Sequence, residues 1–176
     1  RFVGLFLPVR KMSGREAIIV DPILEEICEK YRYKFRDSFR KVKIRVEDRP
    51  MPEGYAYGMR TIVLSGTAIN SLGRDALGAL IAHQIAHLHY KDGLFGLLDI
   101  VVFFPLRLIS RIPYADLFIG AVAFILNFID IRKYVSKYIE YRADKFSRDL
   151  GYQSGLIELL EMYKKMDYYS DVKFLC

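Results

Sequence analysis

The sequence predicts one α+β domain that is mostly helical and carries a small antiparallel sheet or hairpin. The length of 176 residues suits a single domain, so we take residues 1–176 together. Two short segments in the first half have strand-like spacing of apolar residues, whereas longer segments repeat them at helical spacing. Hydrophobic residues make up 52% of the chain, which excludes a disordered protein.

One helix is expected in the N-terminal part. Residues 1–12 are apolar and then basic, which fits either a strand or the end of a membrane segment. Asp21 and Pro22 predict the start of the helix, because Asp is a good N-cap and Pro is tolerated at the first helical position. The apolar residues that should form its buried stripe are Ile23, Leu24, Ile27, Cys28 and Tyr31.

Two short strands are predicted next. Residues 41–47 alternate charged and apolar side chains, as expected for a half-buried strand. Residues 49–58 contain two prolines and two glycines and predict a turn. Residues 60–65 are mostly β-branched or apolar and predict the second strand.

Three helices are predicted in the remainder of the chain. The first covers residues 71–90, where apolar side chains recur at helical spacing. The second is a charged amphipathic helix over residues 132–150, which Gly151 should end. The third covers residues 155–166.

An apolar insertion, residues 94–131, separates the first two of these helices. It holds two apolar runs, 94–106 and 117–129, and neither reaches the ~20 clean residues that a membrane-spanning helix needs. We expect an apolar helical hairpin that either packs in the protein core or lies in or on a membrane. Its exposed apolar face would bind a membrane or be buried in a homo-oligomer.

The net charge of +6 is concentrated in residues 30–45, where eight basic residues accompany Asp37 and aromatic residues alternate with the first of them. Such a stretch can bind nucleic acid or anionic lipid. It can equally be the solvated end of a helix that leads into a strand. We favour the second interpretation and expect no nucleic-acid partner.

The segment His83-Gln84-Ile85-Ala86-His87 carries the most informative chemistry. Helical positions four apart differ by about 40° in direction, so both imidazoles leave one face of the helix. Two neutral imidazoles in this arrangement can bind one Zn²⁺, although two surface histidines would share the spacing. Apolar residues in the preceding turns place the pair on a buried or cleft-lining helix.

A zinc site of this kind needs a third protein ligand and leaves a fourth position for water. The candidate ligand is Glu140, and Asp144 follows four residues later on the same predicted helix. Asp144 would then accept the second N–H of a ligating histidine. For these two acidic residues alone, a solvated helix face is the simpler explanation.

Taken together, these motifs resemble a known family. Residues 80–92 (LIAHQIAHLHYKD) are followed, after the apolar insertion, by Glu140-x-x-x-Asp144 and then by Gly151. This combination resembles the HtpX-like and CAAX prenyl protease family of zinc metallopeptidases, which are gluzincins. The resemblance covers residues 41–150.

The resemblance implies a zincin-like fold, one Zn²⁺ per chain and metalloendopeptidase activity on peptide or protein substrates. It implies that His83, His87 and Glu140 bind the zinc and that the apolar insertion is a pair of membrane helices. Residues 55–58 and the strand after them are similar to that family's segment just before the active-site helix.

A substrate strand and a location are also expected. We expect the second strand to be an edge strand that pairs with an extended substrate; its residues are Thr61, Ile62, Val63, Leu64 and Ser65. We expect a membrane-associated protein with a cytoplasmic active site. Cys28 and Cys176 lie far apart and can build no disulfide framework, which is typical of a reducing compartment.

Two positions depart from the family pattern. Gln84 stands where the family has a glutamate, and Glu53 or Gly54 stands where the family usually has an asparagine. A metallopeptidase needs a carboxylate at the first position to take a proton from the metal-bound water, and an amide cannot do so. We therefore expect this chain to bind zinc and to cleave little or nothing.

Two origins of Gln84 are open. The substitution is either an engineered one that silences a peptidase, which we favour because the rest of the motif is intact, or natural. In the natural case the chain would be a catalytically dead zinc-binding module that interacts with peptides.

Overall fold

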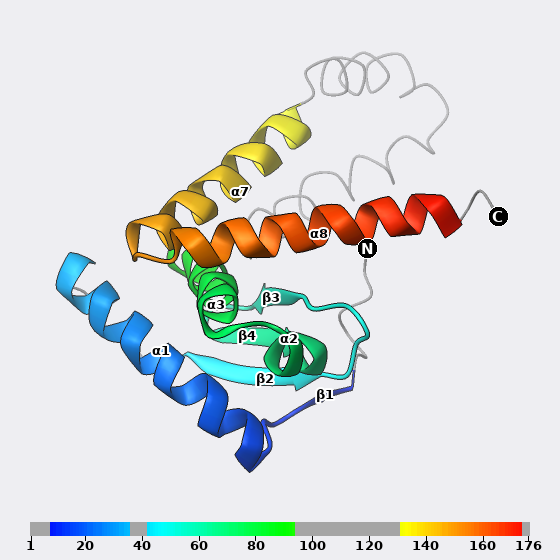
Figure 1. The fold of residues 1–176 in the computed structure, drawn as a ribbon. Helices are drawn as coiled ribbons and strands as arrows, with labels where there is room; N and C mark the ends of the chain where they lie inside the picture. Colours follow the sequence, from blue (N-terminus) through cyan, green and yellow to red (C-terminus); the bar gives the residue numbers. More distant parts are fainter. Residues whose placement is uncertain (1–7, 36–41, 94–130, 174–176) are drawn as a thin grey trace, which may run out of the picture.

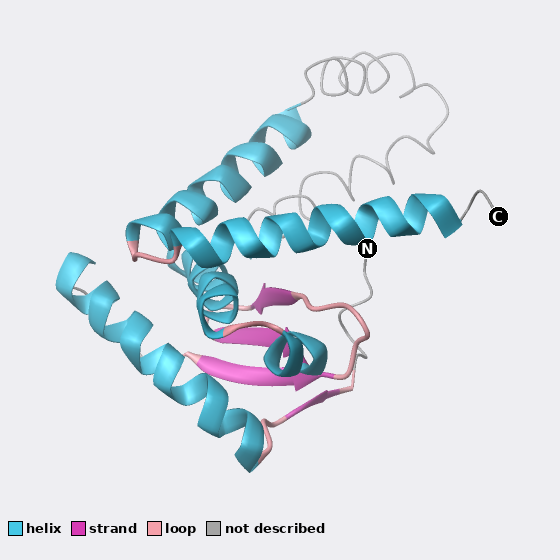
Figure 2. Ribbon diagram, viewed as in Figure 1, coloured by secondary structure: helices cyan, strands magenta, loops and turns pink. Residues whose placement is uncertain are grey.

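The computed structural model describes residues 8–35, 42–93 and 131–173, and the fold given below is that of these residues. They form a small sheet covered by helices, so the predicted α+β class is confirmed (Figures 1 and 2). The strands are β1 (Val9–Arg10), β2 (Lys43–Glu47), β3 (Gly54–Tyr57) and β4 (Thr61–Ser65). The helices are α1 (Gly14–Phe35), α2 (Gly66–Ser71), α3 (Arg74–His89), α7 (Ile131–Asp149) and α8 (Gln153–Lys173).

The sheet is mixed rather than antiparallel, with strand order β1-β2-β4-β3. The two predicted strands, β2 and β4, pair in parallel, with Ile44 opposite Ile62 and Val46 opposite Leu64. The hairpin joins β3 to β4 around Gly58, whose φ of 63° is the left-handed conformation that a glycine adopts readily. The predicted turn over residues 49–58 is thus wrong in part, because pairing with β4 outweighs the local preference of proline and glycine for turns.

The prediction that Thr61–Ser65 is an edge strand is wrong. β4 pairs with β2 on one side and with β3 on the other, so both of its backbone edges are occupied. Its side chains Ile62 and Leu64 are fully buried in the core. Within the described sheet the outer strands are β1 and β3.

Helix α3 lies between the sheet and the pair formed by α7 and α8 (Figure 1). It agrees with the predicted helix over 71–90, except that the separate helix α2 precedes it. Two glycines allow α8 and the residue just before it, Tyr152, to approach α3 closely. A Cβ on Gly155 would lie 2.0 Å from the carbonyl oxygen of Asp75, and one on Gly78 would lie 2.5 Å from the ring of Tyr152.

Helix α1 begins at Gly14, seven residues before the predicted start at Asp21. Ser13 and Glu16 form a capping box: the Ser13 N–H donates to Glu16 Oε2 at 2.7 Å, and the Glu16 N–H donates to Ser13 Oγ at 3.4 Å. Arg10 also binds Glu16, and this hydrogen bond holds the pKa of Glu16 at about 2. Pro22 is accommodated inside the helix on its exposed side.

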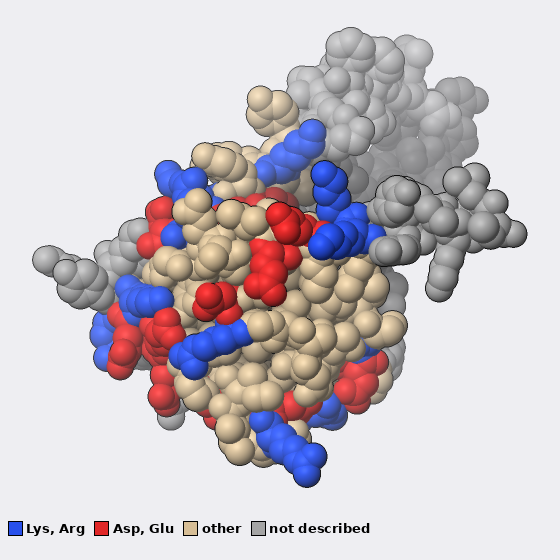
Figure 3. Space-filling view, in the orientation of Figure 1, with Lys and Arg blue, Asp and Glu red and all other residues tan. Residues whose placement is uncertain are grey.

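The predicted buried stripe of α1 is largely correct. Ile23, Ile27 and Tyr31 are at most 2% exposed, and Leu24 and Cys28 are half-buried. The Tyr31 hydroxyl lies 2.6 Å from His89 Nδ1, so this ring is part of the core and is unavailable for stacking on a nucleotide base. Residues 36–41 of the basic stretch lie outside the described residues. On the face drawn in Figure 3, acidic and basic side chains are intermixed.

The two C-terminal helices agree with the prediction. Gly151 separates α7 from α8 with a φ of 91°, and its N–H donates to the carbonyl oxygen of Arg148 at 2.9 Å. Helix α8 is longer than the predicted 155–166. The apolar hairpin predicted for 94–131 lies outside the described residues, apart from Ile131 itself. None of the helices in the described part of the chain has the length and apolarity that crossing a bilayer requires.

Candidate metal centre

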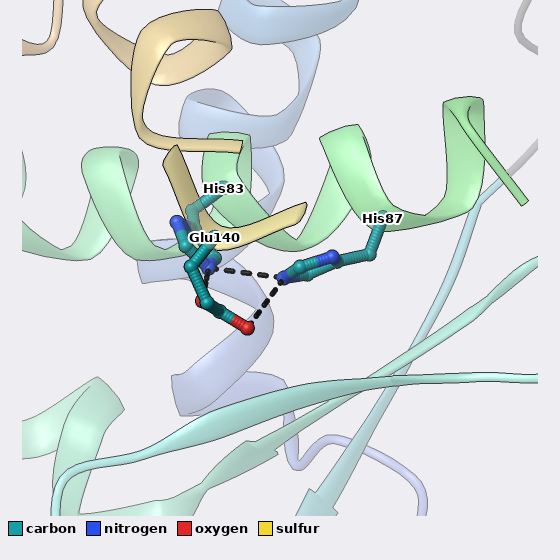
Figure 4. A group of neighbouring side chains, drawn as sticks. All are labelled: His83, His87 and Glu140. Atoms are coloured by element: carbon teal, nitrogen blue, oxygen red, sulfur yellow. Dashed lines mark hydrogen bonds and ion pairs between the residues drawn. The ribbon is translucent and has the colours of Figure 1, made fainter. Parts of the chain in front are cut away.

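His83 and His87 lie on consecutive turns of α3, and Glu140 extends from α7 towards them (Figure 4). His83 Nε2 is 3.0 Å from His87 Nε2 and 3.2 Å from Glu140 Oε2. His87 Nε2 is 4.0 Å from Glu140 Oε1. Three ligand atoms on one tetrahedral zinc ion lie roughly 3.3 Å from one another, given the usual bond lengths. The three side chains therefore enclose a space suited to one such ion.

Each histidine uses its other nitrogen to bind a carboxylate. His83 Nδ1 is 2.8 Å from Asp144 Oδ1, and His87 Nδ1 is 2.9 Å from Asp92 Oδ2. An ionised carboxylate only accepts hydrogen bonds, so each Nδ1 carries a proton and, in a neutral ring, each Nε2 presents a lone pair. Two lone pairs and a carboxylate that converge need a cation or a proton between them, so these residues fit a zinc ion.

The same contacts change the acidity of the site. Burial lowers the pKa of His83, but hydrogen bonds with Asp144 and Glu140 outweigh it and raise the pKa to about 9. The hydrogen bond with His83 holds the pKa of Glu140 below its usual range, against the opposing effect of burial. A proton and a metal ion would therefore compete for His83 Nε2, and metal binding would release the proton.

Asp92 contacts the candidate metal centre, and the sequence reasoning missed this contact. The end of α3 brings it to His87: Lys91 has a left-handed φ of 56°, and the Asp92 N–H donates to the His87 carbonyl oxygen at 3.0 Å. The Lys91 N–H donates to the Leu88 carbonyl oxygen at 3.3 Å, which completes a Schellman motif. A position five residues after His87 lies off the ligand face of a straight helix, so only this turn makes the contact.

The structure places the other predicted residues as follows. Asp144 reaches His83 rather than His87, from the same helix as Glu140. Gln84 lies on α3 between the two histidines, and its side chain is buried. The β4 residues named as a substrate strand belong to the inside of the sheet.

Comparison with known proteins identifies the chain at the level of a family. A family model described as Peptidase family M48 matches residues 19–166, which include both helices of the metal centre. A comparison with curated proteins gave no match. M48 metallopeptidases are zinc-dependent, in agreement with the donor set of His83, His87 and Glu140. From the extent of the matched region, this chain belongs to peptidase family M48, a family of metallopeptidases.

Proposed function

We propose that the chain has the architecture of a zinc metalloendopeptidase of the gluzincin type, similar to the HtpX-like and CAAX prenyl proteases. The observation that carries this proposal is the convergence of His83, His87 and Glu140, with a carboxylate behind each histidine. His83, His87 and Glu140 would hold one Zn²⁺, which supplies a Lewis acid for the peptide carbonyl and an activated water when it is bound. Asp92 and Asp144 would keep the two imidazoles oriented.

Gln84 decides what this chain does with a bound peptide. Removal of a proton from the attacking water requires a basic group beside the fourth metal position, and a glutamine amide has no basic form near neutral pH. The amide can donate and accept hydrogen bonds to the water and to the carbonyl of the substrate. The chain as given is therefore proposed to bind metal and peptide without cleavage, whether Gln84 is engineered or natural.

The substrate is proposed to pair with β3 in place of β4. β3 pairs with β4 on one side only, so in the described sheet its other edge offers free backbone N–H and C=O groups. It packs against α3, the helix that carries both histidines. An extended peptide that adds to this edge would be held by backbone hydrogen bonds close to that helix.

Membrane association is proposed on two grounds. The insertion 94–131 is apolar in sequence, and α7, which follows it directly, presents three tyrosines on its outward face. Tyr134, Tyr138 and Tyr141 are 82%, 60% and 63% exposed, and Lys137 and Lys145 lie on the same side of the helix. Tyrosine rings favour the headgroup region, and lysines favour anionic lipid. A cytoplasmic active site and a homo-oligomer remain part of this proposal.

The decisive experiment is Gln84→Glu, which restores a carboxylate with almost no change of shape. We expect zinc-dependent hydrolysis of casein or a peptide library to rise by at least about 10²-fold, with self-cleavage during expression, because general-base catalysis contributes 10²–10⁴-fold. The matched control is Gln84→Glu combined with His83→Ala, which should cleave nothing. If the Gln84→Glu chain binds zinc and still cleaves no substrate in a broad panel, the peptide-interaction module takes the place of the enzyme.

A further inference from the structure

We propose that Asp92 and Arg142 form a charged pair that positions His87, so that one turn of α7, residues 140–144, orients both histidines of the metal centre. Asp92 and Arg142 act through His87 and are positioning residues. The inference rests on the proposed metal centre and assigns a role to two charged side chains outside its ligand set.

The first observation is how Asp92 reaches the imidazole. The turn after α3 brings Asp92 back to His87 and makes two contacts between them. The Asp92 backbone N–H donates to the His87 carbonyl oxygen, and the Asp92 carboxylate binds His87 Nδ1. This requires a left-handed backbone at Lys91, which is unfavourable for a residue that has a Cβ. The fold thus maintains an unfavourable conformation at the position that directs Asp92 towards the ring.

The second observation is that Arg142 holds the other oxygen of the same carboxylate. Its Nη2 donates to Asp92 Oδ1, while His87 Nδ1 binds Oδ2. The Asp92 side chain is only 7% exposed, so these two partners take the place of water. The guanidinium also stacks on Tyr90, with Cζ 3.8 Å from the ring centroid. A planar guanidinium fixed by stacking is suited to keep a buried carboxylate in one orientation.

The third observation is that fold stability alone does not explain Arg142. Its Nε is buried and has no hydrogen-bond partner among the described residues. A buried donor without a partner is destabilising, and apolar replacements of buried ion pairs often leave a protein as stable or more stable. The presence of a partly unpaired arginine at this position is explained if Arg142 orients Asp92.

Residues 140–144 of α7 therefore contact both histidines of the metal centre, directly or through Asp92. Glu140 supplies the third ligand, Asp144 binds His83 directly, and Arg142 reaches His87 through Asp92. Glu140 and Asp144 are four residues apart and therefore leave α7 on the same side. Arg142 lies two residues from each of them, so it leaves the helix in a different direction and reaches Asp92 with its long side chain. Correct packing of α7 on α3 would therefore assemble all three protein ligands together.

The test compares zinc affinities of the full chain by competition with a chromophoric chelator. Asp92→Asn should weaken zinc binding by about 10–100-fold, the usual effect of losing such a partner. Arg142→Met should weaken it by at least about threefold, and the double variant should bind no more weakly than Asp92→Asn alone, because Arg142 acts through Asp92. The matched control is Arg148→Met, the same change at an exposed position of α7, which should leave the affinity unchanged.

A spectroscopic measurement separates positioning from stability. In the Co²⁺-loaded chain the Nδ1–H protons of the two ligating histidines give hyperfine-shifted, exchangeable NMR resonances. Asp92→Asn and Arg142→Met should shift or broaden one of these resonances, that of His87, and leave that of His83 in place. Arg142→Lys replaces the methionine variant if that variant does not fold. Lysine keeps the charge but lacks the planar, stacked guanidinium, so the His87 resonance should again shift or broaden.

Two results would overturn the inference: independent, multiplying losses of affinity in the double variant, or two unchanged resonances in both single variants. Failure of the proposed function has a different signature. A Gln84→Glu chain that binds zinc normally and cleaves nothing removes the peptidase but leaves these affinity and NMR tests valid. An intact chain that binds no zinc removes both proposals.

Discussion

The two histidines of the metal centre are held by carboxylates that reach them by different routes. The partner of His83 is Asp144, which is 61 residues away and belongs to another helix. The partner of His87 is Asp92, which is five residues away in the turn that ends the same helix. This local contact nevertheless depends on α7, because Arg142 binds the second oxygen of Asp92. Helix α3 alone therefore supplies the histidines but leaves their orientation to α7.

Removal of a metal ligand should have the largest effect on zinc binding, because it eliminates the site whose histidines Asp92 and Asp144 orient. We expect one zinc per chain in the intact protein and none in His83→Ala, measured by elemental analysis after dialysis against zinc and then buffer. His89→Ala removes the third histidine of the chain, which binds Tyr31, and should retain one zinc. Unchanged occupancy in His83→Ala would refute the ligand assignment.

Removal of the long-range carboxylate should have the next largest effect. Asp144→Asn should weaken zinc binding by roughly 10–100-fold, because the His83 ring loses the acceptor that orients it. The losses from Asp144→Asn and Arg142→Met should multiply, since the two residues act on different histidines. If the double variant binds zinc as tightly as Asp144→Asn alone, Asp144 and Arg142 do not act independently on different histidines.

A change in the scaffold away from α7 should separate stability from metal affinity. Gly155→Ala should lower the free energy of unfolding by about 1–3 kcal/mol, because the added methyl group would meet the Asp75 backbone of α3 and force α8 to move. Chemical denaturation measures this loss, and zinc affinity of the folded variant should change little. Gly14→Ala is the matched control, because its Cβ would meet no atom within 4 Å and should cost nothing.

The smallest expected effect concerns the turn at Lys91, which brings Asp92 to His87. Lys91→Gly should raise the free energy of unfolding by up to about 1 kcal/mol, because glycine adopts the left-handed conformation without a steric cost. The turn and its contact with His87 should be preserved, so zinc affinity should stay the same. Thermal unfolding with and without zinc measures both quantities. A large loss of zinc affinity in Lys91→Gly would mean that the lysine side chain itself contributes to the site.

Errors in the sequence predictions have specific physical causes. Asp21 and Pro22 predict the start of α1, but the capping box of Ser13 and Glu16 begins the helix earlier, and the helix continues past Pro22. The proline and glycine residues around β3 predict a turn there. The strand conformation of β3 comes from pairing with β4, which is a tertiary interaction. The parallel pairing of β2 and β4 is likewise a tertiary interaction, because β3 separates the two strands in the sequence.

The amino-acid sequence by itself determined the α+β class, the helix with His83 and His87, the later helix with Glu140 and Asp144, and the absence of a carboxylate at position 84. These follow from periodicity and residue chemistry, which are local. Only the tertiary structure decided which histidine each carboxylate binds, that β4 is an inner strand, and that Asp92 and Arg142 belong to the centre. Those contacts depend on how α7 packs on α3 and on a left-handed turn at Lys91, and neither is encoded in spacing along one element.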